Sequence, residues 1–128
     1  MAVGVARGMV RSDTWRLYLE CTRNGVVLDL TGAKLWFTAK VALSDADAAA
    51  VIQLDTATGA VANGEILIES PAANGKVTVK LNTAATSAVP DAGVTWFYDV
   101  QLKESTGVIT TLETGTLRVE PDVTKATS

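Results

Sequence analysis

Residues able to do acid–base or nucleophilic chemistry are few in this chain of 128 residues, which has one cysteine, Cys21, and no histidine. Without histidine, neither a Ser-His-Asp triad nor a Cys-His pair can form, and the commonest general base is absent. Glycoside hydrolysis needs only two carboxylates, so the acidic residues are the remaining catalytic candidates. The acids that we expect at turns or on solvent-facing sides of strands are Asp13, Glu20, Asp29, Asp55, Glu65, Glu69, Asp99, Glu104 and Glu113. Solvated surface charge explains them more simply than catalysis, and we predict a protein that is not an enzyme.

Metal and cofactor sites are equally poorly supported. Asp45 and Asp47 form an Asp-x-Asp pair, which begins some calcium loops, but residues 48–51 supply no side-chain oxygens. A short helical turn with Ser44 as its N-cap explains both acids without a metal. Cys21 lies among apolar residues, and nothing nearby in the sequence would lower its pKa, so we expect a buried, reduced thiol. The chain has no glycine-rich nucleotide-binding motif. The sequence therefore predicts no catalytic, metal or cofactor site.

Charge and hydropathy exclude two classes of partner. The formal net charge is −3, and the lysines and arginines are scattered singly. Binding to nucleic acid requires clustered positive charge, so we expect none. No stretch approaches the roughly 20 apolar residues of a membrane span. Arg7 and Arg11 interrupt the apolar N-terminus, so it has no signal-peptide core, and we expect synthesis in the cytoplasm.

The elements that must position any site are predicted by alternation. Apolar and polar residues alternate in five runs, which are residues 15–21, 34–41, 76–81, 96–103 and 116–120. Alternation with a period of two gives a strand one dry face and one wet face, which is typical of antiparallel sheets. Asn24-Gly25 predicts a hairpin between residues 15–22 and 26–30, and Thr106-Gly107 predicts another. Short strands at this spacing favour an all-β sandwich or barrel.

Residues 44–53 and 82–89 break the alternation and predict one or two short helical turns in crossovers between sheets. We divide the chain into an N-terminal arm (residues 1–12), a β-sandwich domain (residues 13–120) and a C-terminal tail (residues 121–128).

Two aromatic residues are the best candidates for a binding surface. Trp36 and Phe97 fall on the opposite face from the apolar sets of their strands. Such a ring can cover a sheet edge, but exposed on a sheet face it marks a protein interface or a platform for sugar stacking. The apolar arm, with Val3, Val5 and Met9, could add a strand to a neighbouring molecule. We take these five residues as candidates for a protein interface.

Four segments resemble a known family. Residues 13–37 carry a strand, a tight turn and Asp29-Leu30-Thr31-Gly32-Ala33, followed by a strand with an aromatic residue. This segment resembles N-terminal modules of tailed-phage baseplate and tail-associated proteins, among them the upper baseplate protein. The other matching segments are residues 75–81, 94–102 and 114–121. Together the resemblance spans residues 11–124.

The resemblance implies an antiparallel immunoglobulin-like β-sandwich without enzymatic activity. It implies a virion structural protein of a tailed bacteriophage, made in the bacterial host cytoplasm, that docks onto other virion proteins. The tail, baseplate, neck and capsid surface all remain open as its place, and we expect a homo-oligomer or multiple symmetric copies in the particle. The alternative is a carbohydrate-binding module that uses the aromatic residues on its sheet face.

Overall fold

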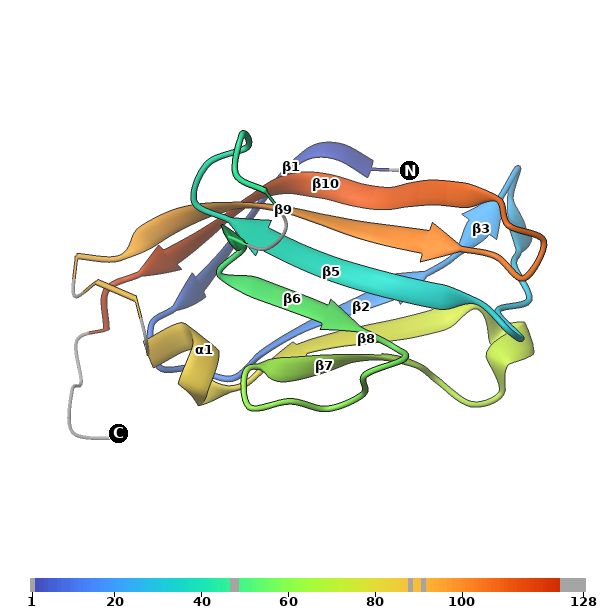
Figure 1. Cartoon of the computed structure of the whole chain (residues 1–128), viewed down its shortest axis with the longest axis horizontal. Coiled ribbons are helices and arrows are strands. Elements are labelled where there is room, and N and C mark those ends of the chain that lie inside the picture. The colour runs from blue at the N-terminus through green and yellow to red at the C-terminus, as the bar shows by residue number, and fades with distance from the viewer. Residues whose placement is uncertain (1, 47–48, 88, 91, 123–128) are drawn as a thin grey trace.

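The structure is a computed structural model that describes residues 2–46, 49–87, 89–90 and 92–122. Strands account for most of the regular structure (Figure 1). In chain order, the strands are β1 (Ala2–Val10), β2 (Trp15–Glu20), β3 (Thr22–Arg23), β4 (Val26–Val27), β5 (Lys34–Lys40), β6 (Ile52–Asp55), β7 (Gly64–Ile68), β8 (Lys76–Leu81), β9 (Val94–Lys103) and β10 (Ile109–Glu120). The prediction of a mostly β protein is confirmed. No helix in the described part of the chain has the length and apolarity needed to cross a membrane.

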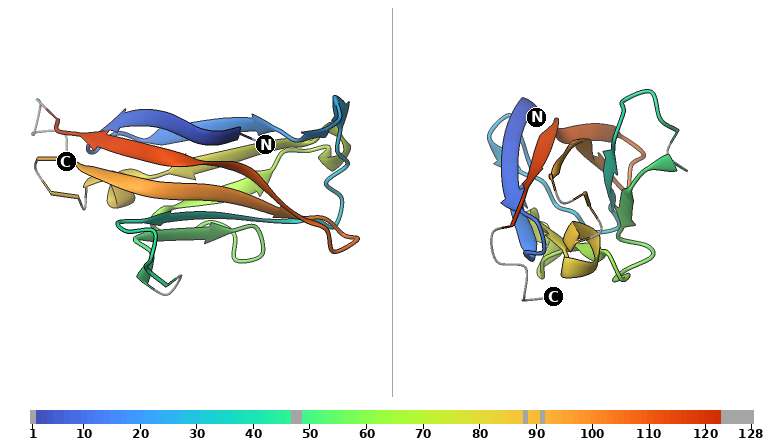
Figure 2. Two further views of the ribbon diagram at one scale, coloured as in Figure 1. Left: turned by 90° about the horizontal axis from the view of Figure 1, so that it is seen from above. Right: turned by 90° about the vertical axis from the view of Figure 1, so that its left-hand side faces the viewer.

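The strands form two main sheets and a small hairpin. The larger sheet has five strands in the order β1-β10-β9-β5-β6, and the smaller has three in the order β2-β8-β7. Figure 2 shows the larger sheet and the remaining strands as two layers, with β1 at one edge beside β10. The chain leaves the larger sheet after β1 and returns to it at β5, and it leaves again after β6 and returns at β9.

The core lies between the sheets and follows the predicted alternation. On β9 every second residue is buried, from Trp96 through Tyr98 and Val100 to Leu102. The β8 residues Val77, Val79 and Leu81 and the β5 residues Leu35, Phe37 and Ala39 are buried in the same way. Phe37 sits in the middle, with its ring centroid 6.4 Å from that of Trp15 and 5.8 Å from that of Tyr98. Aromatic rings at such separations attract one another beyond the effect of area burial.

The N-terminal segment departs from the expected antiparallel pattern. Residues 2–10 of the predicted arm form β1, which pairs in parallel with β10 of the same chain. The pairing has an irregularity between Val3 and Val5, where Gly4 adopts a φ of +69°. A side chain on Gly115 would place its Cβ 1.9 Å from the carbonyl oxygen of Val5. Only glycine therefore allows β10 to approach β1 this closely.

The first predicted hairpin is shorter than expected. Asn24 and Gly25 both have positive φ, as a type I′ turn requires, but they join only β3 and β4. The preceding strand β2 pairs instead with β8 in the other sheet. Pairing with β8 makes β2 part of a sheet whose apolar side packs in the core, which an isolated two-stranded hairpin would not provide. The second prediction is confirmed, because β9 and β10 form an antiparallel hairpin with Gly107 in its turn.

One of the two predicted helical turns is an α-helix. Helix α1 (Thr83–Ser87) falls within the predicted residues 82–89, and a short 3₁₀ helix spans Ala72–Asn74. Residues 47–48 of the other segment lie outside the described residues. In the described part of residues 44–53, Ala49 is in 3₁₀ conformation and its N–H donates to the carbonyl oxygen of Ala46 at 2.9 Å. Strand β6 begins at Ile52, so the prediction of a helix as far as Gln53 was wrong. Pairing of Ile52 with Ala39 of β5 outweighs the helical preference of the alanine run.

Candidate functional site

The outer face of the five-stranded sheet gathers the exposed alternate residues of β5, β9 and β10. Cross-strand pairing places Lys40 beside Phe97, Thr38 beside Asp99 and Trp36 beside Gln101. On the other side of β9, Thr114 pairs with Asp99. These pairs form a row of mostly polar side chains along the middle of the sheet. We call the side of the sheet that carries them the outer face.

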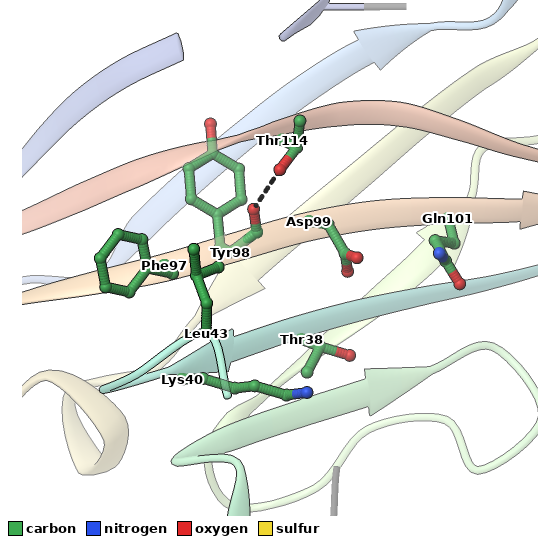
Figure 3. A pocket seen from close by; sticks show the side chains of 8 residues that line it. All are labelled: Thr38, Lys40, Leu43, Phe97, Tyr98, Asp99, Gln101 and Thr114. Carbon is green, nitrogen blue, oxygen red and sulfur yellow. Dashed lines mark hydrogen bonds between the residues drawn. The ribbon is translucent and has the colours of Figure 1, made fainter. Parts of the chain in front are cut away.

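A shallow pocket of about 240 Å³ lies on the outer face. Figure 3 shows the side chains of Phe97, Asp99 and Gln101 along β9 on the same side of the sheet as Thr38 and Lys40 of β5. The pocket is lined by Thr38, Lys40, Leu43, Phe97, Tyr98, Asp99, Gln101 and Thr114. It thus offers an ammonium group, a carboxylate, an amide and two hydroxyls next to a phenyl ring.

The loop after β5 completes the pocket on one side. The Nζ atom of Lys40 donates a hydrogen bond to the carbonyl oxygen of Asp45 at 2.9 Å. The backbone N–H of Ala42 donates to the Asp45 carboxylate at 3.2 Å, which fixes the turn between them. Leu43 at the tip of this turn is 73% exposed and lines the pocket together with Phe97. The Asp45 side chain therefore closes this turn by accepting from a backbone N–H that precedes it in the chain.

Trp36 and Phe97 both lie on the outer face and are half-buried. They are not neighbours: Phe97 pairs with Lys40, which lies four residues along β5 from Trp36. At roughly 3.3 Å per residue, the two aromatic residues are about 13 Å apart along the strand direction. The Thr38–Asp99 and Trp36–Gln101 pairs leave a polar strip between the two rings. The aromatic residues therefore flank a polar surface and do not form one continuous stacking platform.

The candidates on the N-terminal segment lie at the opposite edge of the sheet. Val3 and Val5 belong to β1, and Val5 is half-buried. Met9 is only 7% exposed and packs in the core of its own chain. An interface role that requires an exposed Met9 side chain is therefore inconsistent with this arrangement. Met9 on the inner side of β1 packs in the core, and the β1 backbone pairs with β10, whose edge would otherwise be unpaired.

A partly buried ion pair that the sequence did not predict attaches β1 to the sheet. Arg7 donates from Nε and Nη2 to the two carboxylate oxygens of Glu113, at 2.7 and 2.8 Å. The Tyr98 hydroxyl donates to the same carboxylate and accepts a hydrogen bond from Arg7 Nε at 3.2 Å. The bonds from Arg7 lower the pKa of Glu113, while burial raises the pKa of Tyr98 to about 12. We call Arg7, Glu113 and Tyr98 the β1 anchor.

Glu113 was expected on the surface, and this expectation was wrong, because the residue is 3% exposed. The pairing of β10 with β9 shifts between Thr111 and Glu113, which changes the side of the sheet to which the following residues point. Alternation alone cannot locate such a shift. One signal could have suggested a buried acidic partner: Arg7 is the only charged residue among positions 2–10 of the sequence.

Other candidate chemistry has no geometric support in the described residues. No group of three or more His, Cys, Asp or Glu side chains that could hold a metal ion is found among them, and Asp47 lies outside them. Cys21 is 1% exposed, as predicted, and burial raises its pKa to about 11. A thiol with this pKa stays protonated near neutral pH and is a poor nucleophile.

The segment Asp29–Ala33, which carries most of the family resemblance, is fully used by a turn. The Asp29 carboxylate accepts hydrogen bonds from the backbone N–H and hydroxyl of Thr31, at 3.0 and 2.7 Å, and these bonds lower its pKa. Gly32 has a φ of +75°, and Ala33 donates to the carbonyl oxygen of Leu30. Leu30 itself is fully buried. These residues set the entry of the chain into β5.

Comparison of the chain with protein-family models and with curated proteins gives no match.

Proposed function

We propose that this protein is an immunoglobulin-like domain that serves as a non-enzymatic structural component of a tailed-bacteriophage virion. Its role is to dock onto other virion proteins through the outer face of its five-stranded sheet. The tail, baseplate or neck is the favoured place, and decoration of the capsid is also compatible. The particle would be assembled in the host cytoplasm, with several symmetric copies of the domain.

The strand order supports the immunoglobulin-like assignment. Variable-type immunoglobulin domains have a sheet with the order G-F-C-C′ facing a sheet that contains B, E and D. Here β10-β9-β5-β6 and β2-β8-β7 follow the same order. Buried Phe37 on β5 occupies the strand that carries the core aromatic residue of such domains. Cys21, the sole cysteine, has no partner for the disulfide that antibody domains form.

The observation that carries the docking role is the outer face itself. Protein interfaces are enriched in aromatic anchors surrounded by polar groups that form hydrogen bonds across the contact. Half-buried Trp36 and Phe97 stand on either side of a strip containing Thr38, Asp99 and Gln101. Leu43, at 73% exposure, adds an apolar side chain beside Phe97. The same face carries part of the resemblance to tail-associated modules.

Incorporation into particles tests this proposal. A Trp36→Glu variant should fold normally, since Trp36 is outside the core, yet its copy number in purified particles should fall at least tenfold. Tyr18→Glu is a matched control, because Tyr18 is 71% exposed on the outside of the other sheet. Normal incorporation of the Trp36→Glu variant, measured by quantitative mass spectrometry of purified particles, would argue against docking through this face.

A carbohydrate-binding module is the second candidate, and the polar pocket between the rings favours it. Sugars bind to protein sites that combine an aromatic surface with hydroxyl, amide and carboxylate groups. The pocket provides them in the ring of Phe97, the hydroxyls of its two threonines, the amide of Gln101 and the carboxylate of Asp99. A glycan array should then show binding that is lost in Trp36→Ala and Phe97→Ala and kept in Tyr18→Ala. Absence of glycan binding by the unmodified protein would remove this candidate and leave the docking proposal in place.

A further inference from the structure

Strand β1 is an edge strand joined to the rest of the domain by a short, strained turn. It pairs with β10 alone and ends at Val10, while β2 begins at Trp15 in the opposite sheet. The N–H of Asp13 donates to the carbonyl oxygen of Val10 at 3.1 Å, which closes a turn over Arg11 and Ser12. Ser12 has a φ of +72°, a left-handed conformation that is unfavourable for any residue with a Cβ.

The hydrogen bonds and ion pair that hold β1 and the adjacent Arg11 are made with residues far along the chain. Arg7 binds Glu113 and Tyr98, and the β1 backbone pairs with β10 from Glu113 to Glu120. Arg11, next to the turn, donates to the carbonyl oxygens of Ser87 and Val89. None of these acceptors belongs to the turn itself. The β1 strand of a second copy could therefore make every one of these contacts without changing them.

The C-terminal end of the turn, at Asp13, is held in place by a hydrogen bond from helix α1. The Thr86 hydroxyl, fully buried, donates to the carbonyl oxygen of Asp13 at 2.7 Å, so Asp13 stays attached to helix α1. Opening about Ser12 would let β1 swing away as a unit, and an extended Ser12 would lose its left-handed strain. Short hinges under strain favour exchange of an element between copies, since the exchanged contacts are the same.

We propose that β1 is an exchangeable strand, and that its partner is a second copy of this chain: β1 of each molecule pairs in parallel with β10 of the other. Arg7 of one copy would then bind Glu113 and Tyr98 of its partner. The contact lies at the β1 edge and is independent of the docking role proposed for the outer face, so either can fail without the other.

Cross-linking of full-length chains tests the exchange directly. Ala6 is exposed on β1 and is the register partner of Thr116 on β10. A chain carrying Ala6→Cys is mixed with a chain carrying Thr116→Cys, unfolded, refolded together and treated with a short bismaleimide. Exchange should give a covalent dimer of one chain of each kind. The native thiol of Cys21 is 1% exposed and does not compete.

The control replaces the acceptor position. The Ala6→Cys chain is mixed with a Tyr18→Cys chain, whose thiol would lie on the outside of the other sheet. This mixture should give at least tenfold less covalent dimer. Equal cross-linking in the two mixtures would indicate random collision and would count against exchange.

Two hinge variants test the cause. Ser12→Gly relieves the left-handed strain and should weaken the dimer about fivefold for each hinge, equivalent to about 1 kcal/mol. Ser12→Pro cannot adopt a positive φ and should shift the protein toward the exchanged dimer. Light scattering after size-exclusion chromatography measures both. A monomeric wild type at every concentration, together with no product from the Ala6→Cys and Thr116→Cys mixture, would overturn the proposal even if Ser12→Pro failed to fold.

Discussion

Removing the cation of the β1 anchor should be among the most damaging changes available in β1. The change is Arg7→Met, which keeps much of the aliphatic stem but deletes both hydrogen bonds to Glu113. The carboxylate left behind is 4% exposed, while the Arg7 side chain is 35% exposed. The Glu113 carboxylate therefore loses its counter-ion while it remains almost completely shielded from water.

The magnitude follows from this geometry. Removing one partner of a buried ion pair destabilises a protein by about 3–5 kcal/mol. The one-third exposure of Arg7 reduces this value, because solvent already screens part of the attraction. The Tyr98 hydroxyl still donates to Glu113, which reduces it further. We expect a loss of about 2 kcal/mol at pH 7, which for a chain of this size lowers Tm by roughly 8 °C.

The loss should depend on pH in a defined direction. Hydrogen bonds from Arg7 lower the pKa of Glu113 in the folded protein below its unfolded value. The stability that this pair contributes is therefore complete above the unfolded pKa of Glu, near 4.3, and is lost as the pH falls through the folded pKa. The difference between wild type and Arg7→Met should be large at pH 7 and shrink in acid.

Urea unfolding followed by tryptophan fluorescence at neutral and acidic pH measures both quantities. The double variant Arg7→Met with Glu113→Gln is the matched control, because a neutral amide leaves no unpaired charge and still accepts the hydrogen bond from the Tyr98 hydroxyl, so that most of the lost stability should be recovered. An Arg7→Met variant within 0.5 kcal/mol of wild type at pH 7, or a loss that is the same at both pH values, would refute the role given to the anchor.

Two further substitutions and one reactivity measurement probe the packing. Gly115→Ala should destabilise the protein by more than about 2 kcal/mol, because its Cβ would lie 1.9 Å from a backbone oxygen of Val5; Gly8→Ala, whose nearest atom is 3.9 Å away, is the thermal-melting control. Cys21 should react with a thiol reagent at pH 8 at least a hundredfold more slowly in the folded than in the unfolded protein, since its pKa is raised to about 11; equal rates would contradict its burial. Thr86→Val should cost about 1–2 kcal/mol in urea melts by leaving a loop carbonyl without its donor, and Thr83→Val, at an exposed position, should be near neutral.

The outer face could be predicted in part from the sequence. The opposite placement of Trp36 and Phe97 relative to the apolar residues of their strands follows from the period of two, and both residues lie where that period put them. The separation between them could not be predicted, because it depends on the pairing register of β5 with β9. The pocket also needs the turn between Ala42 and Asp45 to bring Leu43 toward Phe97, and the alternation, which ends at residue 41, did not predict this turn.

The sequence by itself determined the local properties of this protein. Alternation selected strands and their buried faces, and Asn24-Gly25 and Thr106-Gly107 marked tight turns, because these signals depend on residues close together in the chain. The tertiary structure alone decided which strands are partners. It paired β2 with β8, placed β1 in parallel on β10, and buried Glu113 beneath Arg7, more than 100 positions away in sequence. Partner choice rests on shape and charge that become adjacent only after the chain has folded, and no period in the sequence records them.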